Sequence, residues 1–264
     1  MAPFKLGKEN IFHIQIPLLI ALVPIIIWGI YVFGTRVIIS LLTSVLVSFL
    51  CEALFLLIIK KIKEFSPIAP LIYGTLSSLI LPVASPIWVF ALSGFISSLI
   101  RLITYKNTEK AMRINPISAS GIILFGLLPQ FSNKFTAPFE KLSPFQSIPD
   151  DMIVTTILKS IKNGTDSITN STLLNSFLGR DSGAFGEIST LLILIGGIYL
   201  IRKKFISWEI PVSILSTVFL ISFFFPTGNC EAIYCASIET LSGGAFLWAF
   251  FIAPLPSSSP LTKS

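Results

Sequence analysis

Long apolar runs, separated by short polar breaks, dominate the chain. They cover about 14–33, 37–59, 68–81, 86–104 and 116–128 in the first half, and about 188–201, 210–225 and 241–253 in the second. A helix of about 20 apolar residues crosses the hydrocarbon core of a bilayer, whereas a run of about 14 residues makes only about 21 Å of helix. The pattern therefore predicts an all-α integral membrane protein with about eight membrane segments, some of them short.

One long polar interval, about 130–186, divides these runs into two groups. It is rich in Ser, Thr, Pro, Asn and Asp, and it contains one stretch with the pattern of an amphipathic helix at about 152–161. We therefore expect three parts. These are a first membrane repeat of five segments at 1–129, a loop at 130–186, and a second membrane repeat of three segments at 187–264.

A weak internal repeat relates the two groups of segments. Residues 82–86 and 256–260 both have the pattern Pro-x-x-Ser-Pro, and both follow apolar turns that contain Gly. If successive segments alternate in direction, the two motifs face opposite sides of the membrane, as in inverted repeats. Two unrelated Pro-rich helix ends explain the similarity equally well. If the repeat holds, the second copy is incomplete, because the two segments after 82–86 have no counterpart after 260.

Composition supports a membrane protein and argues against nucleic-acid binding. Hydrophobic residues make up 53% of the chain and charged residues 12%, against about 25% charged residues in soluble domains. The net charge of +6 does not indicate nucleic acid, because the Lys and Arg residues stand at the ends of apolar runs instead of on one folded face. With a cytoplasmic N-terminus, thirteen of the 19 Lys and Arg residues fall on the cytoplasmic side. Both termini are therefore expected in the cytoplasm, and the 130–186 loop outside it.

The few Cys and His residues limit metal chemistry. Iron–sulfur clusters usually require four Cys ligands, and the chain has three, Cys51, Cys230 and Cys235. The single His, His13, stands at the edge of the first apolar run and is typical of the membrane interface. We expect no metal site, and an organic carrier if the chain transfers electrons. Cys230 and Cys235 fall together outside the membrane, where a disulfide and two free thiols are equally compatible with the spacing.

A stretch of hydroxyl and amide side chains lies inside the polar interval. Asp166, Thr169, Asn170, Ser171 and Thr172 stand within seven residues. Such a stretch forms a plain turn, or it carries a group on one of its hydroxyls. The sequences Asn163-Gly164-Thr165 and Asn170-Ser171-Thr172 also have the Asn-x-Ser/Thr pattern of glycosylation sites.

Read as Asp-x-x-Ser/Thr-x-x-Thr-x-Leu, residues 166–174 resemble the flavin-attachment motif of the RnfD/NqrB family. That family comprises the D subunit of the Rnf complex and the B subunit of the sodium-pumping NADH:quinone reductase. The resemblance implies FMN bound to Thr172 through a phosphoester, with Asp166 and Thr169 at the other motif positions. Asn170 and Ser171 stand where the family has Gly and Ala. Further matches occur in family order, at 73–76, 81–82, 86–88, 115–116, 186–189, 195–197, 208–211, 241–244 and 249–251.

The resemblance implies a membrane-embedded electron-transfer subunit of an Rnf-like ion-translocating oxidoreductase in the bacterial cytoplasmic membrane. Such a subunit is not catalytic alone. Its expected partners are other membrane subunits, flavin and iron–sulfur subunits, membrane lipid and the flavin transferase. A second, noncovalent flavin such as riboflavin is expected near Asn115. A secondary transporter built from short half-helices and a flavin-free structural subunit of the same complex are the alternatives.

Two carboxylates stand out against the apolar background. Glu52 lies deep inside the second run, where a charge must pair, protonate or face a polar cavity. An ion-translocation site and a structural hydrogen bond are equally compatible with that position, and the resemblance favours the first because the family keeps a functional acid there. Glu187, just before the sixth run, fits the positive end of that helix's dipole.

Overall fold

The computed structural model describes residues 8–60, 65–106, 114–132, 134–143, 145, 152–163, 170–227, 230–242 and 244–255. Five helices form the first half, namely α1 (Lys8–Phe33), α2 (Arg36–Ile58), α3 (Ile68–Leu79), α4 (Ile87–Lys106) and α5 (Pro116–Leu127). The intervening loop contains α6 (Pro129–Ser132), β1 (Phe135–Thr136), β2 (Ile153–Val154), α7 (Ile157–Lys162) and α8 (Asn170–Leu178). The second half contains α9 (Thr190–Arg202), α10 (Glu209–Phe224), α11 (Ala232–Leu241), α12 (Ala245–Leu247) and the π-helix η3 (Trp248–Ile252).

The apolar runs become helices of two lengths. Gln15–Phe33, Arg36–Ile58 and Ile87–Thr104 are long and apolar enough to cross a membrane, and the pair Ala232–Leu241 and Ala245–Ile252, bent by 57°, adds a fourth crossing if it is one span. The shorter apolar helices are Ile68–Leu79, Pro116–Leu127, Thr190–Arg202 and Glu209–Phe224. Each predicted segment therefore corresponds to helical structure, whereas the length of a full span is reached by three or four of the helices in the described ranges.

Three parts of the structure differ from the sequence prediction. The last apolar segment does not begin at 241, because helix α11 already starts at Ala232 and the chain turns at Gly244, which has a φ of 78°. The loop is not all-α, since Phe135 pairs with Val154 and Thr136 with Ile153 in a two-stranded antiparallel sheet. The predicted 152–161 helix is accordingly divided into strand β2, with its β-branched residues, and the short helix α7.

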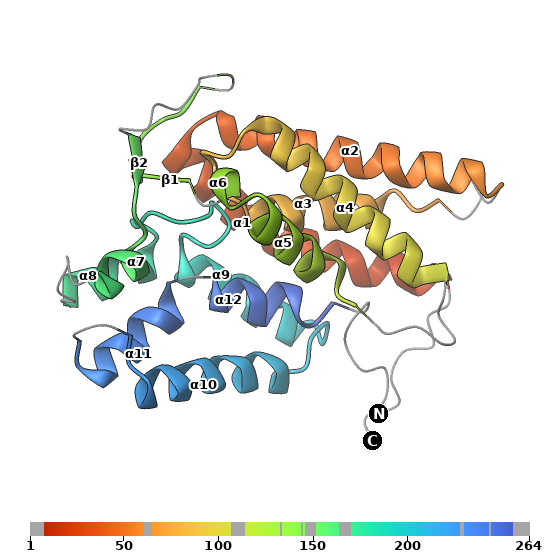
Figure 1. Ribbon diagram of the computed structural model, residues 1–264. Coiled ribbons are helices and arrows are strands. Elements are labelled where there is room, and N and C mark those ends of the chain that lie inside the picture. Colours follow the sequence, from red (N-terminus) through yellow and green to blue (C-terminus); the bar gives the residue numbers. More distant parts are fainter. Residues whose placement is uncertain are drawn as a thin grey trace.

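The long helices run side by side, and the loop elements gather at one of their ends. In Figure 1, α1, α2 and α4 lie across the view, with β1, β2, α7 and α8 at the left. The C-terminal ends of α2 and α4 lie on the right, at the opposite end. The C-terminal ends of α2 and α4, which are basic in sequence, are therefore remote from β1, β2, α7 and α8.

Small residues bring α2, α3 and α4 into close contact. A Cβ atom added to Gly94 would lie 2.2 Å from the carbonyl oxygen of Ser44, and one added to Gly74 would lie 2.8 Å from the Cα of Val45. The Ser44 hydroxyl donates to the Gly74 carbonyl at 2.8 Å, and the Ser48 hydroxyl donates to the Gly94 carbonyl at 3.1 Å. Close backbone approach and hydroxyl–carbonyl bonds are the usual basis of helix packing in membranes.

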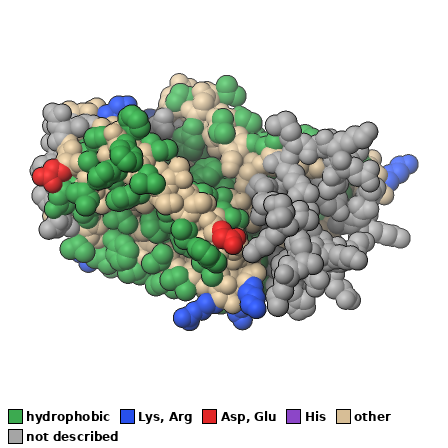
Figure 2. Space-filling model, turned by 90° about the horizontal axis from the view of Figure 1, so that it is seen from below, with side chains coloured by type: hydrophobic (Ala, Val, Ile, Leu, Met, Phe, Trp, Pro, Cys, Tyr) green, Lys and Arg blue, Asp and Glu red, His purple; other side chains and the backbone are tan. Residues whose placement is uncertain are grey.

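One buried core joins both halves and the loop. Phe33 of α1, Phe90 of α4, Phe185 of the loop and Phe251 of η3 are all fully buried, and the rings of Phe90 and Phe185 have centroids 6.5 Å apart. The outer face, by contrast, is apolar. Figure 2 shows hydrophobic side chains gathered on the face of the molecule seen from below Figure 1, where α10 lies. The exposed side chains of α10 include Val212, Leu220, Ile221 and Phe224.

Candidate functional site

A cavity of about 330 Å³ lies where the loop meets the two halves of the protein. Its walls come from the end of α3, from α5, β1, α7 and α8, from the 181–188 segment and from the α11–α12 bend. The lining residues include the apolar side chains Ile80, Phe125, Phe135, Ile188 and Trp248, and the polar side chains Ser176, Asp181, Ser182, Glu187 and Ser242. The cavity thus combines an aromatic wall with a set of hydrogen-bonding groups.

Helix α8 brings the predicted flavin-attachment residue next to this cavity. Thr172 is half-buried in the first turn of α8. Ser176, one turn later, lines the cavity, and its hydroxyl oxygen lies 3.2 Å from the Thr172 carbonyl oxygen. The plain turn considered for this stretch is therefore wrong from Asn170 onward, because the chain is helical there. Ser171 is exposed at the start of the same helix. Asp166 and Thr169 lie outside the described residues.

The far end of α8 is fixed against the membrane helices. Gly179 ends the helix with a φ of +86°, a conformation that favours glycine. Its carbonyl accepts a hydrogen bond from Trp28 Nε1 of α1 at 3.2 Å. The Thr190 hydroxyl, at the start of α9, donates to the Leu241 carbonyl at 2.7 Å and contacts the Ser176 carbonyl at 3.4 Å. These bonds hold α8 beside both α9 and α11.

Two carboxyl side chains on the cavity wall have altered acidity. Burial raises the pKa of Asp181 above its usual range, although the hydrogen bond that its carboxylate accepts from Ser176 acts in the opposite direction. Burial raises the pKa of Glu187 to about 8. Glu187 is half-buried, and it lines the cavity. At neutral pH Glu187 is therefore mainly a neutral carboxylic acid.

The Glu187 carboxyl lies against the backbone of the α11–α12 bend. A Cβ atom at Gly244 would be 2.2 Å from Glu187 Oε1, so only glycine allows this approach. The start of α9 is instead capped by Ser189, whose hydroxyl accepts from the Leu192 amide at 3.4 Å. Sequence reasoning considered Glu187 only as a partner for the dipole of α9, and it missed Ser176, Asp181 and Gly244. The Gly pair at 243–244 was the signal that something packs closely there.

Asn115, the expected neighbour of a second flavin, joins the two halves of the fold. Its side-chain oxygen caps α5 by accepting from the amides of Ile117 and Ser118 at 3.0 and 3.2 Å. Its side-chain nitrogen donates to the Ile252 carbonyl at 2.7 Å. Asn115 is not among the residues that line the cavity beside α8. A noncovalent flavin near Asn115 stays a prediction.

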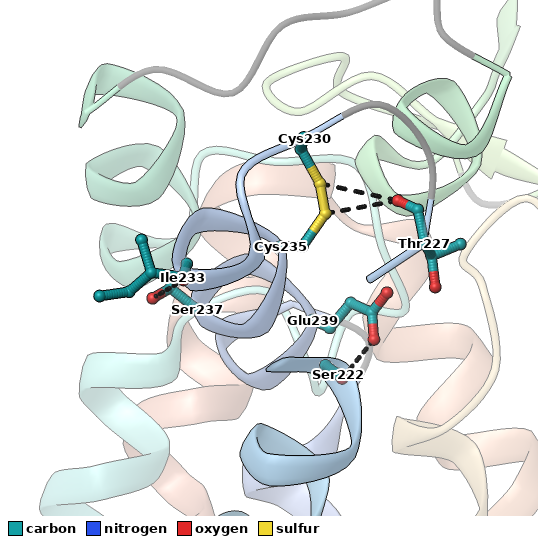
Figure 3. The surroundings of a disulfide bond; sticks show 7 residues. All are labelled: Ser222, Thr227, Cys230, Ile233, Cys235, Ser237 and Glu239. Atoms are coloured by element: carbon teal, nitrogen blue, oxygen red, sulfur yellow. Dashed lines mark hydrogen bonds between the residues drawn. A yellow bond between two sulfur atoms is a disulfide. The ribbon is translucent and has the colours of Figure 1, made fainter. Parts of the chain in front are cut away.

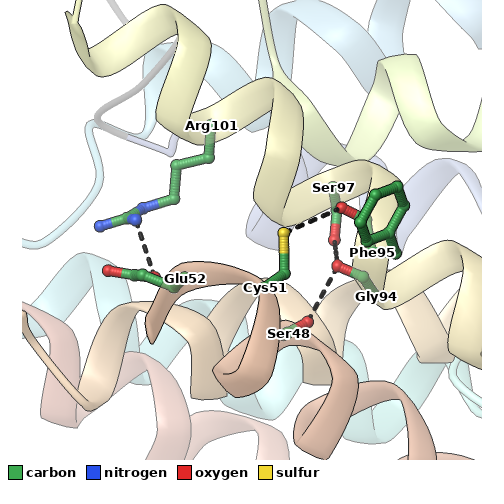
Figure 4. A network of polar contacts seen from close by, with 7 residues as sticks. All are labelled: Ser48, Cys51, Glu52, Gly94, Phe95, Ser97 and Arg101. Carbon is green, nitrogen blue, oxygen red and sulfur yellow. Dashed lines mark hydrogen bonds and ion pairs between the residues drawn. The ribbon is translucent and has the colours of Figure 1, made fainter. Parts of the chain in front are cut away.

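Glu52 is paired inside the helix bundle. Its Oε2 atom lies 2.9 Å from Arg101 Nη1, and its side chain is 2% exposed. Figure 4 shows the two side chains facing each other between α2 and α4, beside the contacts of Ser48 and Cys51. The Arg101 guanidinium also lies over the Tyr73 ring, 5.4 Å from its centre. The structure therefore gives Glu52 a cationic partner that belongs to the protein itself.

Cys230 and Cys235 form a disulfide at the junction of α10 and α11, with Cα atoms 5.9 Å apart. Figure 3 shows the pair beside Thr227, whose carbonyl oxygen lies 3.6 and 3.4 Å from the two sulfur atoms. Below it, the Ser222 hydroxyl of α10 donates to the Glu239 carboxylate of α11. Of the two states open from the sequence, the structure has the disulfide.

Comparison with known proteins identifies the family. The chain is 28% identical to the D subunit of the Na⁺-translocating ferredoxin:NAD⁺ oxidoreductase complex of Acetobacterium woodii, across 99% of this chain and 77% of that protein. It is 27% identical to the D subunit of the proton-translocating ferredoxin:NAD⁺ oxidoreductase complex of Clostridium ljungdahlii, across 99% of this chain and 79% of the relative. It is 25% identical to the D subunit of the ion-translocating oxidoreductase complex of Stutzerimonas stutzeri, across 97% and 79%. Residues 1–264 match the NQR2, RnfD, RnfE family throughout, and the chain is therefore a membrane protein of that family.

Proposed function

We propose that the chain is the D-type membrane subunit of an Rnf-like ion-translocating oxidoreductase complex and that it carries FMN as a phosphoester on Thr172. One observation carries this proposal. Thr172 lies one helical turn from Ser176, on a helix fixed beside a cavity at the loop end of the molecule. A tethered cofactor requires an attachment residue next to a cavity that can hold it.

The residues of the site fit a flavin. The cavity of about 330 Å³ falls in the size range of small-molecule sites, which are mostly apolar with a few placed polar groups. Bound FMN would supply the electron-accepting and electron-donating chemistry that the amino-acid side chains lack. Asn170 and Ser171, which replace the Gly and Ala of the family motif, stand in the first turn of α8. Both residue types are favoured where helices begin, so the altered motif is compatible with the observed helix.

The proposal includes a place and partners for the subunit. The relatives are subunits of multi-subunit ferredoxin:NAD⁺ oxidoreductase complexes, so electrons would enter and leave through neighbouring flavin and iron–sulfur subunits. The protein would lie in the cytoplasmic membrane. The basic C-terminal ends of α2 and α4 favour the cytoplasm for that end of the protein, with the loop and Thr172 on the outer side. A flavin transferase on the outer side would attach the FMN.

Intact-mass spectrometry tests the proposal. The chain would be purified from cells that contain the flavin transferase, as wild type, Thr172→Ala and the matched control Ser171→Ala. We expect an FMN-sized mass increment on the wild type and on Ser171→Ala, and none on Thr172→Ala. A wild-type chain without the increment, purified with its partner subunits, would identify a flavin-free structural subunit instead.

A secondary transporter is the second candidate, favoured by one feature of the fold. Helices α11 and α12 break beside the cavity, with a bend of 57°, and broken helices around a central site are typical of transporters. A transporter needs no chromophore. Visible absorption and the FMN increment on the purified chain would therefore favour the electron-transfer subunit, and solute uptake by reconstituted, flavin-free protein would favour the transporter.

A further inference from the structure

We propose that the cavity beside α8 holds the isoalloxazine ring of the flavin, with the Glu187 carboxyl as its hydrogen-bonding partner. This inference rests on the proposed function, because it concerns the ring of the cofactor that Thr172 would carry. It goes further by assigning a binding site to side chains outside the attachment motif. Three independent features of the structure support it.

The first feature is position. Thr172 and Ser176 are four residues apart on α8, so they lie on the same side of the helix. Ser176 lines the cavity. A ribityl chain with its phosphate is longer than one helical turn, about 5.4 Å. A flavin tethered to Thr172 would thus reach the cavity without any movement of α8.

The second feature is the wall of the cavity. Phe125, Phe135 and Trp248 come from α5, β1 and η3, and they meet around one space together with Ile80 and Ile188. Planar aromatic ligands pack well against such rings, in offset-stacked or edge-to-face arrangements. The side chains come from both halves and from the loop, so the folded protein is needed to form the site.

The third feature is the chemistry of the polar edge. The isoalloxazine ring carries carbonyl oxygens next to an N–H group, so its partner must both donate and accept hydrogen bonds. A neutral carboxylic acid does both. Glu187 meets this requirement at neutral pH, because its burial favours the protonated form. The carboxyl group packs against Gly244 at the wall of the cavity.

Two glycines provide a matched test of this site. Gly183 lines the cavity, Gly126 does not, and a Cβ atom at either position would meet nothing within 4 Å. A leucine at 183 would add a bulky side chain at the cavity wall, whereas a leucine at 126 would add one at a position outside the lining. The readout is flavin fluorescence, which a nearby indole such as Trp248 quenches.

The experiment compares native and denatured fluorescence in the wild type, Gly183→Leu, Gly126→Leu, Trp248→Phe and the control Trp88→Phe. Trp88 is exposed and packs on Phe131 instead of on the cavity. We expect strong quenching in the native wild type, Gly126→Leu and Trp88→Phe. Gly183→Leu and Trp248→Phe should become several-fold brighter while their FMN mass increment is retained. Equal quenching in Gly183→Leu and wild type, with FMN attached to both, would overturn the inference.

A second arm separates this inference from the proposed function. If the wild type carries no FMN increment, the covalent proposal fails, and riboflavin is titrated into the same detergent-purified protein. Saturable quenching of riboflavin by wild type and Gly126→Leu, lost in Gly183→Leu, would still support the cavity as a flavin site. Absence of quenching, or equal quenching in all three proteins, would reject it.

Discussion

Arg101 Nη1 lies 2.9 Å from Glu52 Oε2, so the acid in the second apolar run is paired across the α2–α4 interface. Glu52 is almost completely buried, and Arg101 is mostly so. A charge at this depth must be paired or neutralised, and Arg101 provides the pair without any external ion. The pair is compatible with a structural role, and also with an ion path in which Arg101 occupies the place of the cation.

Replacing Glu52 by Gln should leave the Arg101 charge without its counter-charge. Breaking a buried ion pair on one side costs about 3–5 kcal/mol, so we expect Glu52→Gln to lower the thermal stability of the purified protein clearly. The double variant Glu52→Gln/Arg101→Gln, which removes both charges, should recover most of the loss. Thermal unfolding in detergent measures both effects.

Ion transport by vesicles that contain the assembled complex separates the two roles of Glu52. If Glu52 lies on the ion path, the double variant will fold, assemble and keep its flavin, and it will still pump poorly. Normal pumping by the double variant would limit Glu52 to the structural role.

Glu187 should make the stability of the protein depend on pH. Its pKa rises from an ordinary 4.5 to about 8 on folding, so the folded state binds more protons than the unfolded state between these values. The stabilising contribution is complete below about pH 4.5 and is lost as the pH rises through 8. Each unit by which the pKa of a group differs between the folded and unfolded states corresponds to about 1.4 kcal/mol of stability. Burial also raises the pKa of Asp181, so Asp181 acts in the same direction.

The measurement is the thermal midpoint of wild type and Glu187→Gln from pH 5 to pH 9. Gln has nearly the shape of the neutral acid and cannot ionise, so the fall in midpoint between pH 6 and 9 should be much smaller in the variant. The Glu209→Gln variant serves as a control, because Glu209 stands at the start of α10 and does not line the cavity. Identical pH profiles for wild type and Glu187→Gln would contradict the raised pKa.

Gly94 should be the least replaceable glycine in the α2–α4 contact. The Cβ atom of an alanine there would lie 2.2 Å from the Ser44 carbonyl oxygen, which is backbone and cannot rotate away. We expect Gly94→Ala to lower stability by about 1–3 kcal/mol. Gly126→Ala is the control, because its Cβ meets nothing within 4 Å and alanine favours helix by up to about 1 kcal/mol. If the Gly94→Ala protein were as stable as the Gly126→Ala protein, α2 and α4 would be able to move apart at little cost, which would contradict the prediction.

The apolar runs predicted where the helices lie, because each run must satisfy its backbone internally and a helix is the simplest way to do so. Of the eight membrane segments expected, three or four reach the length of a full span in the described ranges. The sequence pattern failed where small polar residues form helix. The segment from Asn170 to Leu178 has the composition of a turn, yet it is helical. Tertiary bonds, such as those of Thr190 with Leu241 and Ser176, hold it in place, and no local pattern encodes them.

The candidate site could be predicted only in part. Thr172 was proposed through a motif, because attachment motifs consist of residues that are close in sequence. Glu187 and Gly244 are far apart in the chain, and their contact exists only after α9 and α12 have packed. The pKa of Glu187 depends on that burial, so neither the neutral acid nor the cavity beside it is visible in the sequence.

The disulfide between Cys230 and Cys235 affects the stability of the α10–α11 junction, and it also bears on the side of the membrane where that junction lies. Closing so short a loop should stabilise the α10–α11 junction by about 2 kcal/mol. Cys230→Ser and Cys235→Ser should therefore lower the thermal midpoint by similar amounts, whereas Cys51→Ser, which removes the free thiol of α2, should not.

Non-reducing peptide mapping of protein alkylated in intact cells should find the 230 and 235 peptides linked. Disulfides persist in oxidising compartments, so the link would also favour an extracytoplasmic position for this junction, on the same side as Thr172. Recovery of both peptides alkylated and unlinked would show that the disulfide is absent in cells. The disulfide would then no longer support an extracytoplasmic position for the α10–α11 junction.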